Sequence, residues 1–310
     1  MPIVGNIMDL PPKGVQDWVH WLKHKTLYGP ISSITVLGQT FVIAQDGVCV
    51  RNGRMGRSFG PESTVAQFDS LQEVEAHRFL LRVLQDPLRL AQHIQTEAGA
   101  IILQIAYGYK IEPFKRDPLV HSANEALEHG VQAATPGTWL VDIIPICAGF
   151  KRTAEGWKKD LLSLSERPYA FVRAQVESGQ YRPSYLADIF RTGVPARGSE
   201  EDEVAKWTAA SLYTGGADTT VSSIECFFLA MALFPGVQQK AQEEIDRVLG
   251  PSRLPKIADR AILPYIGAIV KEVLRWHPVA PMAIPHMSTA DDFWGQYFIP
   301  KGSLIMPNIW

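Results

Sequence analysis

Residues 211–221, SLYTGGADTTV, bring together residue types that can handle protons inside a helix. Asp218 supplies an ionisable carboxyl group, and the Thr219 hydroxyl lies one helical turn from the main-chain carbonyl of Gly215. We expect the Thr219–Gly215 bond to open the helix locally. Gly215 and Gly216 have no side chains, so a flat ligand or a small gas molecule can lie against bare backbone. A notch with a hydroxyl and an acid suits the delivery of protons to a bound species.

Each candidate group of residues also has a structural interpretation. The two glycines allow close packing of two helices, and from this stretch alone that interpretation is favoured. Glu272 and Arg275 stand three residues apart and share a helix face, where an exposed ion pair is the simpler interpretation. His286 follows a proline in an extended segment, and a lone histidine is typically structural. A functional interpretation of these residues is therefore supported only when all three groups are considered together.

The elements that must position these residues are mostly helical. Ser199, with Asp202 three residues later, resembles a capping box and begins a helix that we expect to reach Leu233. About 35 residues at 1.5 Å each give roughly 50 Å, a length typical of a helix that crosses a large domain. Apolar spacing and Gly or Pro punctuation predict further helices within 15–28, 62–86, 87–108, 117–134, 150–179, 237–249 and 263–277.

A small β portion is expected from both ends of the chain. Residues 31–44 predict two strands joined by Gly38-Gln39, a pair suited to a type II′ hairpin. Residues 293–310 return to short strands and turns after the last helix. The predicted fold class is mainly α with a small β portion, in a single domain over residues 1–310.

Composition and charge limit the classes of partner and compartment. The chain has 30 basic and 32 acidic residues, so its electrostatics indicate neither nucleic acid nor an anionic membrane as a partner. Cys49, Cys147 and Cys226 show no metal-ligand spacing and give no disulfide framework. No apolar run approaches the ~18 residues of a membrane span, and no signal peptide is evident. We expect the chain as written to be cytoplasmic.

Taken in order and spacing, these groups resemble the cytochrome P-450 superfamily. GGADT resembles the oxygen-binding motif of the family's long central helix, usually Ala/Gly-Gly-x-Asp/Glu-Thr. EVLR matches the family's Glu-x-x-Arg, and the segment from PVAPMAIPHMSTADD to GQYFIPKGS is similar to the family's next segment. PIVGN at the start resembles the family's proline-rich hinge. Within the superfamily the sequence resembles fungal microsomal members, with an expected role in secondary metabolism.

The resemblance implies a heme-dependent monooxygenase. Such enzymes insert one oxygen atom of dioxygen into a lipophilic small molecule, using electrons from NADPH that arrive through NADPH–cytochrome P-450 reductase. Asp218 and Thr219 are then implied to supply protons to dioxygen at the heme, for which Gly215 and Gly216 leave room. The family is expected at the endoplasmic reticulum membrane.

The resemblance also implies roles for the two later groups. Glu272 and Arg275 are expected to form a buried structural pair behind the heme, and His286 is expected to contact a heme propionate. On this basis, removing the Glu272 carboxylate should leave a buried guanidinium unpaired and destabilise the protein strongly.

The chain also departs from the family's pattern. The family's heme iron is held by a cysteine thiolate in a Phe-x-x-Gly-x-Arg-x-Cys-x-Gly loop, which does not occur in these 310 residues. None of the three cysteines replaces it, so no metal ligand is assigned, and the fold is expected to be incomplete at its C-terminus. Two stretches look shortened, Asp46–Phe59 and Ile146–Phe150. We expect the chain as given to be catalytically incompetent.

Two alternatives from other functional classes remain at this point. The first is a non-enzymatic, truncated paralogue that contains no heme and acts by binding. The second is an unrelated helical binding module, which requires the three motifs to coincide by chance in the right order.

Overall fold

The computed structural model describes residues 6, 9–12, 14–36, 39–45, 68–112, 117–134, 151–191 and 193–310. They belong to two compact units, one formed by Met1–Gly60 with Gly267–Trp310 and the other by Pro61–Ile266. The grouping of all 310 residues as one functional domain stays a prediction.

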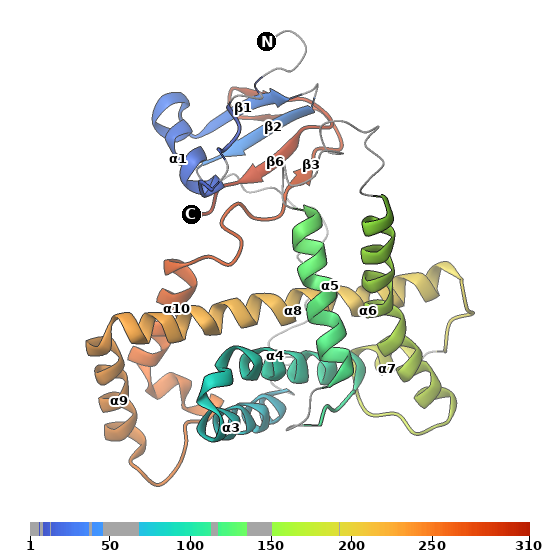
Figure 1. The fold of residues 1–310 in the computed structure, drawn as a ribbon, viewed down its shortest axis with the longest axis vertical. Coiled ribbons are helices and arrows are strands. Elements are labelled where there is room, and N and C mark those ends of the chain that lie inside the picture. Colours follow the sequence, from blue (N-terminus) through green and yellow to red (C-terminus); the bar gives the residue numbers. More distant parts are fainter. Residues whose placement is uncertain are drawn as a thin grey trace. The chain divides into compact units, whose positions relative to one another are not determined.

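The described part of the larger unit is helical (Figure 1). Its elements are α3 (Asp69–Gln85), η3 (Pro87–Arg89), α4 (Leu90–Tyr107), α5 (Pro118–Ala134), α6 (Lys151–Glu177), α7 (Tyr185–Phe190), α8 (Glu200–Leu233), α9 (Pro235–Leu249) and η6 (Ile257–Ile262), with α10 (Pro264–Trp276) starting at its end. The long central helix is confirmed, and so are the other helices expected in this unit as far as its described residues reach, since residues 62–67 of the range 62–86 lie outside them. The short helix α7 was not expected from the sequence.

Helix α8 forms the centre of this unit, with α4 packed along it (Figure 1). Ala205, Ala209, Tyr213 and Ala217 recur every four residues on α8, and all four are buried in the main hydrophobic core. Residues four apart lie on the same face of a helix, so they form one stripe of mostly small side chains. Small side chains let two helix backbones approach closely, which explains how α4 and α8 pack over much of their length.

The first turn of α8 is anchored by a buried carboxylate. The Asp202 main-chain N–H donates to the Ser199 hydroxyl at 3.2 Å, which confirms Ser199 as the N-cap. The Asp202 carboxylate does not complete a capping box. It accepts a 2.7 Å bond from Arg173 and a 2.9 Å bond from the Gly198 N–H, together with the Tyr169 hydroxyl.

This carboxylate is held in its charged form despite its burial. Asp202 is 6% exposed and Arg173 is 8% exposed. Burial raises the pKa of Asp202, but hydrogen bonds from Tyr169 and Gly198 and the charge of Arg173 outweigh burial and hold this pKa below its usual range. The network therefore ties α6 to the start of α8.

The smaller unit contains a mixed sheet built from both ends of the chain, as predicted. Its order is β1 (Ile31–Val36), β2 (Gln39–Ala44), β6 (Leu304–Pro307) and β3 (His286–Met287). Strands β1 and β2 are antiparallel, whereas β2 and β6 are parallel. Because Val36 pairs with Gln39, the connecting residues are 37–38, one position earlier than predicted, and these two lie outside the described residues.

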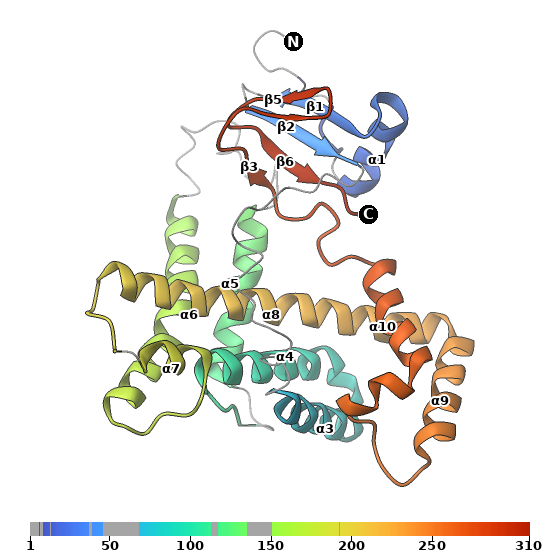
Figure 2. The ribbon, with the colours of Figure 1, turned by 180° about the vertical axis from the view of Figure 1, so that it is seen from behind.

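Both faces of this sheet are covered within the unit. Trp21 of α1 (Asp17–Tyr28) packs with Ile34 and Ile43 on one face. On the other face, Ile31 and Val42 pack with residues of a hairpin formed by β4 (Asp292–Trp294) and β5 (Tyr297–Ile299). Figure 2 shows this unit from behind. Alternate residues of β1 and β2 therefore contribute to two small cores.

We predict that Asp202→Ala destabilises the protein because it leaves the buried Arg173 guanidinium without its main counter-charge. The free energy of unfolding of the larger unit should fall by about 3 kcal/mol, measured by urea denaturation followed by circular dichroism. Asp188→Ala is the matched control, since Asp188 pairs with Arg191 where both side chains are largely exposed, and it should cost less than about 1 kcal/mol. Equal effects of the two substitutions would contradict the proposed anchor.

Candidate active site

The stretch singled out by its chemistry lies in the middle of α8. The Thr219 hydroxyl donates to the Gly215 carbonyl oxygen at 2.6 Å, which confirms the predicted bond. The predicted opening of the helix is not found, because α8 is continuous from Glu200 to Leu233. A threonine hydroxyl can bond the carbonyl four residues earlier without interrupting the helix, and that is what happens here.

The two glycines do different things. A Cβ atom added to Gly215 would have no neighbour within 4 Å among the described residues, apart from the local backbone of α8, so this side of the helix is open in the described part of the chain. A Cβ atom on Gly216 would lie 2.8 Å from Cδ1 and 3.0 Å from Cγ1 of Ile102 on α4. The expectation that both glycines leave room for a ligand is therefore wrong for Gly216, which serves helix packing. Of the two glycines, Gly215 is the one that faces open space.

Gly215, Asp218 and Thr219 form one exposed patch on α8. Positions i, i+3 and i+4 share a helix face, so the carboxyl group and the hydroxyl flank the bare backbone at Gly215. The Asp218 carboxylate is exposed and makes no hydrogen bond to a described residue. The patch therefore combines an accessible acid, a hydroxyl held at a known position and space above a glycine.

The predicted ion pair on α10 forms, but it is not buried. Arg275 donates from Nε and Nη2 to both carboxylate oxygens of Glu272, at 2.8 and 2.6 Å. The Glu272 side chain is 59% exposed and the Arg275 side chain 70% exposed, so the prediction of burial is wrong for the described residues. The pair is exposed because no segment in the described part of the chain covers this face of α10. The hydrogen bonds from Arg275 lower the pKa of Glu272.

His286 lies on β3 in the smaller unit and is exposed. Its Nδ1 atom is 2.7 Å from the Ile284 carbonyl oxygen, and since a carbonyl only accepts, Nδ1 carries a hydrogen. Nε2 is then the ring nitrogen left for a ligand, and it can donate to a carboxylate only when the ring is protonated. The predicted propionate contact stays a prediction.

Sequence similarity identifies the family to which the chain belongs. A sequence model of the cytochrome P-450 family matches residues 85–310. The chain belongs to the cytochrome P-450 family. This match spans α4, α8 and α10, so it contains the GGADT motif and the Glu272–Arg275 pair. The family's members are oxidoreductases that carry heme.

Several fungal cytochrome P-450 proteins match over the whole chain. The monooxygenase ppsD of Aspergillus oryzae is 42% identical over 359 residues, covering 100% of this chain and 68% of the relative. The monooxygenase claR of Ampulloclitocybe clavipes is 39% identical, with 100% and 66% covered. O-methylsterigmatocystin oxidoreductase of Aspergillus flavus is 36% identical, with 100% and 68% covered.

This cytochrome P-450 chain spans about two thirds of the length of these relatives. The match to ppsD extends over 359 positions, whereas the chain has 310 residues. The relative therefore contains internal residues that have no counterpart here, which agrees with the expectation of shortened connections. The two stretches expected to be short, 46–59 and 146–150, lie outside the described residues.

The open flank at Gly215, beside the Asp218 carboxyl group and the Thr219 hydroxyl, would leave room for a flat group such as heme. Cys226 is the cysteine among the described residues, and it lies on α8 two turns after Thr219. The described residues offer no cysteine on another element, so they identify no residue that would hold a heme iron. Cys49 and Cys147 lie outside them.

None of the described helices alone has both the length and the apolar character needed to cross a membrane. Helices α8 and α9 have them only as a pair, by length and composition, and a 104° bend lies between the two.

Some functional features were not predicted. No pattern in the sequence identified Ile102 as the partner of Gly216, although its position in an apolar stretch before Gly108 indicated a packed helix. Arg173 and Tyr169 were likewise not recognised as partners of Asp202. No sequence signal links these positions, because the contacts join different helices.

We predict opposite effects of adding one methyl group to each glycine. Gly215→Ala should raise the free energy of unfolding by about 0.5–1 kcal/mol, because alanine favours helix and its Cβ meets nothing. Gly216→Ala should lower the free energy of unfolding by about 1–2 kcal/mol, because overpacking against Ile102 outweighs the higher helix propensity of alanine. Urea unfolding curves of the two variants provide the measurement.

A second variant isolates the contact. In an Ile102→Ala background, Gly216→Ala should no longer destabilise the protein, since the side-chain atoms it meets are gone. If Gly215→Ala and Gly216→Ala stabilise equally in the original chain, Gly216 has no packing role.

We predict that Glu272→Ala changes the thermal stability only slightly, because both side chains of the pair are largely exposed to solvent. Its thermal midpoint should shift no more than that of Glu243→Ala, an exposed residue on α9. A clearly larger loss for Glu272→Ala would indicate that the pair is buried in the protein in solution.

Proposed function

We propose that the chain forms part of a monooxygenase that oxidises a lipophilic small molecule with dioxygen, and that Asp218 and Thr219 handle protons in that reaction. The observation that carries this proposal is the geometry around Gly215. There, a hydroxyl fixed by a 2.6 Å bond and an accessible carboxyl group flank an open stretch of backbone.

The positions of the two side chains suggest distinct tasks. The Asp218 carboxyl group is exposed and exchanges protons with water at its oxygens. The Thr219 hydroxyl has one hydrogen and two lone pairs. While the hydrogen is bonded to the Gly215 carbonyl, the lone pairs remain free to accept a hydrogen bond from water or a ligand on the open side. Rotation of the hydroxyl then presents its hydrogen to the ligand.

A bound heme would supply the binding and activation of dioxygen. The residues of this chain have supporting roles in the proposal. Gly215 keeps the space above α8 open, and the neighbouring Gly216 lets α8 lie close against Ile102 of α4, which fixes the helix that carries Asp218 and Thr219. His286, in its protonated form, would donate to a propionate.

The family relationship supports the remaining parts of the proposal. One relative is named for O-methylsterigmatocystin, which makes a fungal secondary metabolite a suitable class of substrate for this chain as well. Electrons would come from NADPH through NADPH–cytochrome P-450 reductase, at the endoplasmic reticulum membrane where fungal members typically act. The substrate itself is not specified by the described residues.

We predict that Thr219→Ala uncouples oxygen consumption from product formation in the heme-loaded enzyme that carries this chain. Without the hydroxyl, proton delivery to the bound oxygen species is no longer directed by residue 219. More peroxide and less product should therefore form per NADPH consumed. The measurement is the ratio of product and hydrogen peroxide to NADPH oxidised.

Two further variants make this test specific. Thr219→Ser retains the hydroxyl and should restore most of the coupling, whereas Thr220→Ala, which removes an adjacent exposed hydroxyl, should leave the ratio unchanged. An unchanged ratio in Thr219→Ala would show that Thr219 is only a helix residue.

A further inference from the structure

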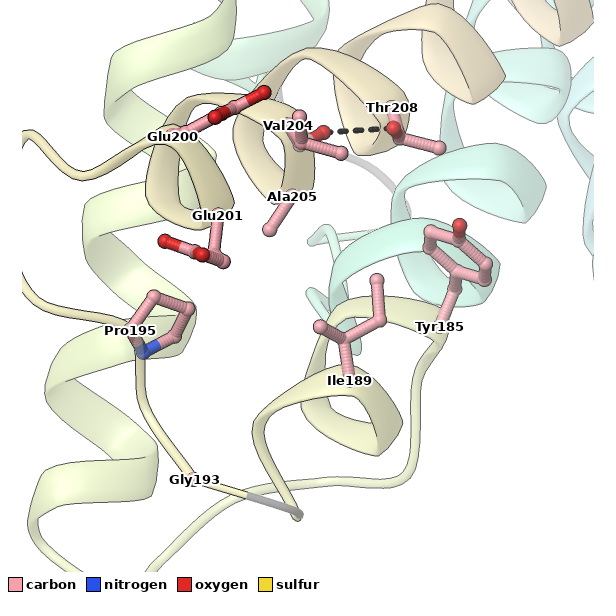
Figure 3. A pocket seen from close by; sticks show the side chains of 9 residues that line it. All are labelled: Tyr185, Ile189, Gly193, Pro195, Glu200, Glu201, Val204, Ala205 and Thr208. Atoms are coloured by element: carbon pink, nitrogen blue, oxygen red, sulfur yellow. Dashed lines mark hydrogen bonds between the residues drawn. The ribbon is translucent and has the colours of Figure 1, made fainter.

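A second open site lies at the start of α8, away from Gly215. A groove of about 740 Å³ separates α7 from the first turns of α8 (Figure 3). Its lining residues are Tyr185, Ile189, Gly193, Pro195, Glu200, Glu201, Val204, Ala205 and Thr208. Known small-molecule sites have volumes of roughly 300–1,000 Å³, so the groove is large enough for such a ligand.

The groove has an acidic end and an apolar body. Figure 3 shows Glu201 and Pro195 on one side of the opening and Tyr185 and Ile189 on the other. Val204 adds an aliphatic surface to the wall, and it is 59% exposed. Two carboxylates, from Glu200 and Glu201, belong to the lining, and no lysine, arginine or histidine of the described chain does.

The carboxylate nearest the apolar walls remains ionised. Glu201 accepts hydrogen bonds from its own main-chain N–H and from the Ser199 hydroxyl, and these lower the pKa of Glu201. Ser199 in turn accepts from the Asp202 N–H, so the hydroxyl is held in place. The lowered pKa favours a negative charge on Glu201 at this end of the groove.

This arrangement selects the charge of the ligand. The N-terminus of a long helix ordinarily attracts anions. Here the first turn of α8 already carries four acidic residues, Glu200, Glu201, Asp202 and Glu203, and a bound anion would face the two carboxylates of the lining. A cation near Glu201 is favoured instead, and the Tyr185 ring is a suitable surface for its charge or for its apolar part.

We propose that this groove binds small organic cations, each combining an ammonium group with an aromatic or aliphatic body. The ammonium group lies near Glu201, and the body lies against Ile189, Val204 and Tyr185. The site does not depend on the proposed oxidation, because Thr208 precedes Gly215 by seven residues, about 10 Å of helix. Binding therefore requires neither heme nor turnover.

The test measures direct binding of (4-phenylbutyl)trimethylammonium to the 310-residue protein by isothermal titration calorimetry and saturation-transfer NMR. A quaternary ammonium has no lone pair, so it cannot bind through coordination to a metal. Its isostere with a neutral tert-butyl group in place of the trimethylammonium is the charge control. We expect the cation to bind more tightly than the neutral compound, with an affinity that falls as salt is added.

Substitutions then locate the site. Glu201→Gln should weaken binding of the cation about two- to fivefold, as expected for an exposed charge pair, and Glu200→Gln/Glu201→Gln should weaken it further. Val204→Arg places a positive charge and a long side chain in the groove and should abolish binding. Leu229→Arg is the matched control, since Leu229 is also exposed on α8 but lies outside the groove.

Each outcome decides the proposal. Circular dichroism and the unfolding midpoint must show that the variants are folded, which the exposed positions of Val204 and Leu229 favour. The proposal is overturned by equal binding of the neutral isostere, by unchanged binding in Val204→Arg, or by a comparable loss in Leu229→Arg. Absence of binding of the cation up to about 10 mM, a concentration that would fill even a weak site, also overturns it.

Discussion

The close contact of α8 with α4 at Gly216 is the constraint on which the larger unit depends. Ile102 lies where a side chain of residue 216 would begin, so the helix surface must be bare at this point. The buried stripe of Ala205, Ala209, Tyr213 and Ala217 adds mostly small side chains to this helix, which lets α4 and α8 pack closely. Since the candidate active site lies on α8, its position is set by this packing.

The same helix presents different surfaces to different surroundings. The face toward α4 is small and apolar, the flank at Gly215 is open and polar, and the first turn is acidic and tied to Arg173 of α6. Adjacent glycines thus serve different purposes, because successive residues of a helix point about 100° apart. One continuous helix can therefore connect a packed core, a candidate active site and a separate groove.

The sequence predicted the elements better than their contacts. Helix ends were evident from local signals such as Gly108, which has a φ of 63° and caps α4, and Pro235, which follows the end of α8; α9 begins at Pro235, two residues before the predicted start. The Thr219–Gly215 bond was predictable because both residues lie in one turn. The contact of Gly216 with Ile102 and the exposure of Glu272 depend on distant segments of chain, and no local pattern specifies these.

The parallel pairing of β2 with β6 has a consequence for biosynthesis. Gln39 and Gly302, which are hydrogen-bonded beside this pair, are 263 residues apart. At translation rates of about 5–20 residues per second, roughly 15–50 s separate the synthesis of β2 from the synthesis of β6. Throughout that time the edge of β2 is an unpaired strand. The nascent chain is therefore exposed to mispairing early, and protection by a chaperone would be needed most for the segment that contains β1 and β2.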